Sequence, residues 1–208
     1  MNVPPATVFH RLRARARLVF PGNGPKIATW TIVNPGEDPI PFAATAPPRP
    51  LAREKGLALA EELGAKKLAL VFFVGPSPTH WPDIFDAAEI LRRSGAACVL
   101  ATRGSVVNAM SAPVIAYHFT TIFITTTAVV PGEDLKGLST LAALQPRGRV
   151  EARIFGQVIP EKEKALREAG ADRVLSWPPA SSRESLIISA DGTMQPGESP
   201  WCADHIRL

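Results

Sequence analysis

Cysteine is scarce in this chain of 208 residues, which contains only Cys98 and Cys202. Two cysteines supply neither a disulfide framework nor the spacing of a zinc site, so the expected location is a reducing compartment such as the cytoplasm. Cys98 lies in the apolar run ACVLAT and is predicted to be a small core residue.

Long apolar segments are also missing. No apolar stretch of about 7–15 residues follows the start, so no secretory signal is predicted. The segment from Gly104 to Gly132 lacks Asp, Glu, Lys and Arg, but it contains Asn108, Pro113 and His118. Its densest part, FTTIFITTT, is rich in β-branched residues. This pattern favours a buried parallel strand over a transmembrane helix, and no transmembrane segment is predicted.

Acidic residues are absent from the first 36 positions, which hold five basic residues. Four of them, Arg11, Arg13, Arg15 and Arg17, alternate with smaller residues. The whole chain has 23 basic and 19 acidic residues, so the remainder is close to neutral. Three interpretations stay open: a solvated edge strand, an arm that docks to nucleic acid or another anionic partner, and a transit peptide that would imply an organellar matrix.

Segments typical of strands and helices alternate along the middle of the chain. Residues 133–177 read as helix, strand, helix, strand, with proline or glycine at each break. Strands are expected at 26–33, 67–74, 98–102, 121–127, 149–155 and 173–177, and helices at 51–64, 83–94, 133–144 and 160–169. Residues 105–116 are ambiguous, with a short helix broken at Pro113 as one interpretation.

This alternation predicts an α/β fold with a doubly wound, mostly parallel sheet, Rossmann-like, of about six strands with helices on both faces. The expected organisation is a basic arm at 1–25, the α/β domain at 26–178 and an irregular tail at 179–208. The tail includes at most one short strand, at LIISA.

The glycine fingerprint of a dinucleotide site is missing. A G-x-G-x-x-G sequence should join the first strand to a helix, but this chain has NPGEDPIPFAATAPPRP there. Gly36 stands alone, and Glu37 and Asp38 would repel phosphate. The cofactor is therefore unknown and none is required, with NAD(P) or an adenine nucleotide as the alternative.

Ligands of such sheets bind at the carboxyl ends of the strands, so three loops supply the candidate residues. Serine and threonine hydroxyls there could hold phosphate, and Arg103 could hold an anionic group such as a 2′-phosphate. A surface loop and ordinary β propensity are the competing interpretations. The cofactor-binding candidates are Gly75, Ser77, Thr79, Thr102, Arg103, Gly104, Ser105, Thr125 and Thr126.

Catalytic motifs are absent as well. The four histidines are far apart, and none has a visible nucleophile or metal-ligand spacing beside it. His80, in a strand-end loop, is the best general acid or base candidate, with a plain surface histidine as the alternative. No catalytic residue and no metal site are predicted.

The segment from TIFITTT to AGADRVLSW resembles the second half of the regulatory domain that gates potassium channels and potassium-uptake systems, the regulator-of-potassium-conductance family. The matching residues are Arg149 to Arg153 and Ala169 to Val174, and the resemblance covers about 80 residues. It implies a Rossmann-like, NAD-binding regulatory domain. The glycine fingerprint and the ribose-binding acid of that family are missing, and Thr102 and Arg103 replace the expected Gly-Asp, so a degenerate nucleotide site is implied.

These features predict a non-catalytic regulatory or assembly module. We expect a protein partner or a homodimer, with the basic arm as a docking site for an anionic partner. One alternative is an enzyme that binds a nucleotide or another phosphorylated ligand, similar to NAD(P)-linked oxidoreductases. The other is a subunit that docks to nucleic acid through its arm.

Overall fold

The computed structural model describes residues 26–34, 52–126, 132–145, 149–177, 179 and 183–202. The predictions for the basic arm, with Arg11, Arg13, Arg15 and Arg17, and for the loop at 36–50 lie outside these residues. The same holds for His10 and His205.

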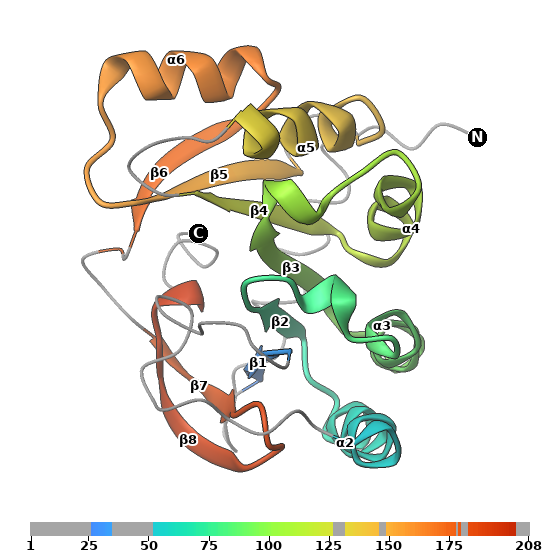
Figure 1. Cartoon of the computed structure of the whole chain (residues 1–208). Helices are drawn as coiled ribbons and strands as arrows, with labels where there is room; N and C mark the ends of the chain where they lie inside the picture. Colours follow the sequence, from blue (N-terminus) through green and yellow to red (C-terminus); the bar gives the residue numbers. More distant parts are fainter. Residues whose placement is uncertain are drawn as a thin grey trace.

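A single sheet of eight strands organises the described residues (Figure 1). Six of them, β1 to β6, are mutually parallel, as the continuous apolar runs of the sequence predict. The strands are β1 (Ile27–Thr31), β2 (Leu70–Val74), β3 (Ala97–Arg103), β4 (Thr121–Thr126), β5 (Val150–Phe155), β6 (Arg173–Trp177), β7 (Arg183–Ile188) and β8 (Met194–Ser199).

In the described parts of the chain, five helices connect the parallel strands, and three short 3-10 turns lie at strand ends. The helices are α2 (Arg53–Ala65), α3 (Ile84–Arg93), α4 (Ser111–His118), α5 (Gly132–Ala142) and α6 (Pro160–Glu168). The 3-10 turns are η1 (Pro78–His80), η2 (Gly104–Val106) and η3 (Pro200–Cys202). The prediction of an α/β fold with a mostly parallel, Rossmann-like sheet is confirmed, and the sheet has two strands more than the six expected.

The strand order refines this prediction in one respect. The order is β6-β5-β4-β3-β2-β1-β7-β8, so the six parallel strands follow one another as they do in the sequence. Crossovers of one hand that always step in one direction place their helices on one face. All five helices accordingly pack on one face of the sheet (Figure 1), and the expected second helical layer does not occur among the described residues.

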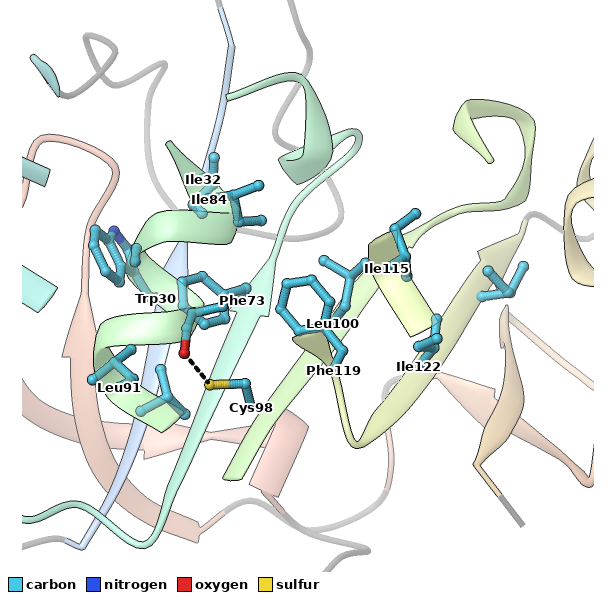
Figure 2. Close-up of a cluster of buried hydrophobic side chains, with 14 of the residues drawn as sticks. Trp30, Ile32, Phe73, Ile84, Leu91, Cys98, Leu100, Ile115, Phe119 and Ile122 are labelled. Carbon is cyan, nitrogen blue, oxygen red and sulfur yellow. Dashed lines mark hydrogen bonds between the residues drawn. The ribbon is translucent and has the colours of Figure 1, made fainter. Parts of the chain in front are cut away.

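The main core lies between this helical layer and the sheet. Figure 2 shows Trp30, Phe73 and Leu100 from three neighbouring strands with Ile84 and Leu91 of α3. Alternate residues of each strand point to this face, so an apolar residue at every second position fills it.

Cys98 belongs to the same core, as predicted. Its thiol donates a weak hydrogen bond to the carbonyl of Ala88, with Sγ and O 3.7 Å apart. Burial raises the pKa of Cys98 to about 12, so the thiol stays protonated and unreactive at neutral pH.

A second, smaller core lies on the opposite face of the sheet. Phe72 and Phe123 project there and pack with Trp177 of β6 and with Trp201, which comes from η3. The C-terminal segment thus helps to cover a sheet face that no described helix covers.

Residues 183–199 are more ordered than the sequence suggested. We expected an irregular tail with one short strand, but β7 and β8 form an antiparallel hairpin. β7 also pairs in parallel with β1, so the hairpin extends the sheet at that edge. The apolar residues Leu186 and Ile188 join the main core, which explains why this segment docks.

The ambiguous stretch around residue 113 contains a helix. Pro113 is the third residue of α4, in the first turn, where its missing N–H costs no internal hydrogen bond. The helix is therefore not broken there. The uncharged stretch also contains β4, whose six residues are all buried. Within the described residues, no helix is both long and apolar enough to cross a membrane.

Candidate functional site

The carboxyl ends of β2, β3 and β4 bring together the residues predicted to bind a cofactor. We call residues 75–79, 102–105 and 125–126 the strand-end rim. Arg103 of β3 is in register with Thr125 of β4, and β2 lies on the other side of β3. The structure thus places the three predicted loops at neighbouring strand ends, as expected. Whether the rim binds a cofactor depends on which polar groups remain available.

Backbone hydrogen bonds tie the end of β2 to the neighbouring strands. The N–H of Gly75 donates to the carbonyl of Ala101 at 3.2 Å, and the N–H of Arg103 donates to the carbonyl of Pro76 at the same distance. The side-chain amide of Asn34 donates to the carbonyl of Ser77 at 2.8 Å. The backbone N–H groups of Gly75 and Arg103 are therefore already used within the protein and are not available to a phosphate.

A buried carboxylate of α5 contacts the strand-end rim. Asp134 lies in the first turn of α5, where a helix attracts negative charge, and it is 4% exposed. One of its oxygens accepts a hydrogen bond from the backbone N–H of Ser105 at 2.8 Å. The other accepts one from the hydroxyl of Thr126 at 2.9 Å. Asp134 therefore acts as an internal anion that satisfies one donor of η2 and one of β4.

Two glycines allow α5 to approach this closely. A Cβ atom on Gly137 would lie 1.9 Å from the carbonyl oxygen of Gly104, and one on Gly104 would lie 2.4 Å from the carbonyl oxygen of Asp134. Gly75 is similarly confined, because its Cβ would lie 2.0 Å from the carbonyl oxygen of Ile32. Gly75 and Gly104, predicted to approach a ligand, approach other parts of the backbone instead.

Three polar side chains of the rim differ in their environment. The hydroxyl of Thr125 donates to the carbonyl of Thr102 at 3.0 Å. The hydroxyl of Thr102 is buried and has no hydrogen-bond partner among the described residues. Arg103 is exposed. Arg103 thus offers an accessible cation at the rim, whereas the hydroxyl of Thr102 is enclosed by the protein.

The end of β1, where a dinucleotide would enter the sheet, is nearly filled. A cavity of about 20 Å³ lies there between Trp30, Asn34 and Trp81. This volume holds about one water molecule.

The histidines do not form an acid–base site within the described residues. His80, the predicted candidate, is exposed in η1. His118 is half-buried between the rings of Phe85 and Tyr117, with ring centroids 5.4 and 4.9 Å from its own. Burial lowers the pKa of His118, which keeps its imidazole neutral near pH 7. No group of three potential metal ligands from His, Cys, Asp and Glu occurs in the part of the chain that the structure describes.

The sequence analysis missed a buried ion pair on the other face of the sheet. Arg153 and Glu151 of β5 are 3.0 Å apart, and their side chains are 1% and 3% exposed. Arg173 of β6 reaches the second oxygen of Glu151 at 3.3 Å. The guanidinium of Arg153 lies 4.4 Å from the ring centroid of Phe123 and 5.8 Å from that of Trp177.

This group is enclosed by aromatic residues. Trp201 of η3 stacks on Trp177 with ring centroids 3.9 Å apart, so the C-terminal segment adds a further aromatic ring beside the ion pair. Because both charges are buried and paired, the group fits a structural role rather than a catalytic one. A sequence signal existed: Glu151 and Arg153 are two positions apart in a buried strand, and alternate residues of a strand share one face.

Removing the internal anion should destabilise the protein. We expect Asp134→Ala to cost about 1–3 kcal/mol of unfolding free energy, because the Ser105 N–H and the Thr126 hydroxyl lose their acceptors. Urea denaturation measures this cost. The matched control is Glu133→Ala at the exposed neighbouring position, where the loss should be at most about 1 kcal/mol. Equal effects of the two substitutions would contradict the role assigned to Asp134.

Comparison with known protein families and with curated proteins found no match for this chain.

Proposed function

We propose that this protein is a non-catalytic regulatory or assembly module that acts by binding a protein partner. The observation that supports this most is the buried carboxylate of Asp134. It lies in the first turn of α5 and accepts hydrogen bonds from donors of η2 and β4. A protein that used this rim for a phosphorylated cofactor would need those donors for its ligand.

The strand order supports the same proposal. In open α/β sheets, ligands bind where the strand order reverses and neighbouring helices lie on opposite faces. Strands β1 to β6 follow one another without a reversal, and their helices all lie on one face. The order reverses between β1 and β7, where the cavity beside Trp30 holds about one water molecule. The strand-end rim at β2, β3 and β4 therefore lacks the crevice that nucleotide-binding sheets provide.

In its most specific form, the proposal is that this module is related to the regulatory domains of the regulator-of-potassium-conductance family. The resembling segment contains β4, α5, β5, α6 and β6, which form one contiguous half of the parallel sheet. Docking through the basic arm and a cytoplasmic location belong to the same proposal and stay predictions.

Binding of a phosphorylated ligand is the second candidate. It is favoured by Arg103, an exposed cation at the carboxyl end of β3, where ligands of such sheets bind.

A thermal-shift screen separates the two candidates. The full-length protein is heated with NADH, NADPH, ATP, AMP and FMN, each at a concentration far above a typical dissociation constant. We expect no change in Tm, because a ligand raises Tm only if it binds the folded state.

The same screen on Arg103→Ala provides the control. A rise of several degrees with one nucleotide, lost in this variant, would favour an enzyme or a ligand sensor over a module that only assembles. The exposed position of Arg103 means that this substitution should leave the Tm of the free protein almost unchanged.

A further inference from the structure

The two edges of the sheet differ in how well they are protected against pairing with another strand. At one edge, β8 has the sequence MQPGES, in which Pro196, Gly197 and Glu198 all disfavour a further strand. At the other edge, β6 has the sequence RVLSW, without proline or glycine and with one charge at its start. Within the described residues, β6 pairs only with β5. The β6 edge therefore lacks the usual defences.

Helix α6 flanks this undefended edge and is the outermost helix on that side (Figure 1). Its neighbour on the inner side is α5: a Cβ atom on Gly170 would lie 2.4 Å from the Cβ of Ala142. Arg167 lines a surface pocket together with Ala142, which places it on the α5 side as well. Leu166 is buried against the sheet.

The opposite side of α6 faces away from α5, toward the open edge of the sheet at β6. By helical spacing, this flank contains Lys162, Ala165 and Ala169, all half-buried, with the exposed Glu168 beside them. The small side chain of Ala165 at its centre leaves room for the close approach of a second helix. Lys162 and Glu168 lie three residues before and after Ala165.

We infer that a second copy of this chain pairs with the β6 edge. Residues Val174, Leu175 and Ser176 of one copy lie antiparallel to the same residues of the other. A two-fold axis perpendicular to the sheet relates the copies and extends the sheet across the dimer. This inference rests on the proposed function as an assembly module and names its partner.

The charges on α6 fit this arrangement. The same two-fold axis brings α6 antiparallel to α6 of the mate. Centred on Ala165, it sets Lys162 level with Glu168 of the mate, and this contact occurs twice. The helix is therefore complementary to its own copy, as an interface between identical surfaces requires.

Light scattering after size exclusion tests the dimer, and variants at the edge locate it. We expect the full-length protein to have twice the mass of one chain. Ser176→Lys adds a charge to the exposed middle of the β6 edge and should convert the dimer to a monomer. The matched control is Gln195→Lys on the exposed edge of β8, which should leave the dimer intact.

A charge swap tests the helix contact separately. Glu168→Lys sets a lysine level with Lys162 of the mate and should weaken association about tenfold or more. Adding Lys162→Glu to this variant exchanges the two charges and should restore association. Glu168→Lys also removes an exposed pair with Lys164, four residues away. Glu62→Lys, which removes the similar pair with Lys66 on α2, controls for that loss.

A monomeric wild-type protein would overturn the inference, and so would a dimer that persists in Ser176→Lys and Glu168→Lys. Neither result decides whether the protein is non-catalytic. The thermal-shift screen with nucleotides tests that proposal, and it does not depend on oligomeric state. Conversely, a nucleotide-dependent rise in Tm would favour an enzyme or a ligand sensor without bearing on the mass of the protein.

Discussion

Replacing Glu151 with glutamine is expected to destabilise the protein by about 3–5 kcal/mol, since it breaks a buried ion pair from one side. The positive charge of Arg153 would stay buried between aromatic rings without its carboxylate 3.0 Å away. The neighbouring Arg173 is half-exposed and can return to solvent, so it adds little to the cost. Urea denaturation, followed by the fluorescence of the tryptophans, measures the change.

The double variant Glu151→Leu with Arg153→Met is the control. It removes both charges and keeps similar volumes, so we expect it to be much more stable than the single variant. A single variant within about 1 kcal/mol of the wild-type protein would show that the pair is not buried as described.

Replacing Gly137 with alanine is expected to cost about 3 kcal/mol or more, because the new methyl group would collide with backbone. The added Cβ would lie 1.9 Å from the carbonyl oxygen of Gly104, and neither group can move without shifting α5 away from η2. This shift would also withdraw Asp134 from its two donors. The midpoint of urea unfolding is the measurement.

The matched control is Gly132→Ala at the start of the same helix. A Cβ atom there would meet nothing within 4 Å, so the substitution should be neutral or slightly stabilising. If Gly137→Ala is also neutral, the close contact between α5 and η2 is not part of the native structure.

Local pattern predicted the elements of this fold well. The run RVLSW coincides with β6, and the apolar runs of the other parallel strands lie within a few residues of their observed limits. Buried parallel strands need continuous apolar residues, and the helices between them end at Gly64, Gly95 and Gly170 or within two residues of these. Such signals are local, so a sequence shows them directly.

The order of strands is not a local property. The same succession of strands and helices suits a doubly wound sheet or a sequential one, because the choice depends on which neighbour each strand meets. The hairpin of β7 and β8 was missed for a related reason. Its sequence is rich in polar and turn-forming residues, and only pairing with β1 gives β7 a place in the sheet.

The candidate site was likewise predictable from the sequence only in its local features. Sequence reasoning located the strand-end rim, because parallel strands end at one edge. It could not foresee that Gly75 and Gly104 serve contacts between backbone segments, or that Asp134 turns back to the rim. Those facts depend on how closely α5 approaches η2 and on how closely the end of β2 approaches the chain after β1, which no sequence pattern reports.

The backbone amide of Ser105 offers the most direct test of the central claim, that an internal carboxylate closes the rim. In an ¹H–¹⁵N NMR spectrum this amide should be slow to exchange with solvent, and its chemical shift should stay fixed on addition of NAD⁺, AMP or inorganic phosphate. It should move in Asp134→Ala. A Ser105 amide that exchanges freely in the wild-type protein, or that shifts in a saturable way with one of these ligands, would contradict the account.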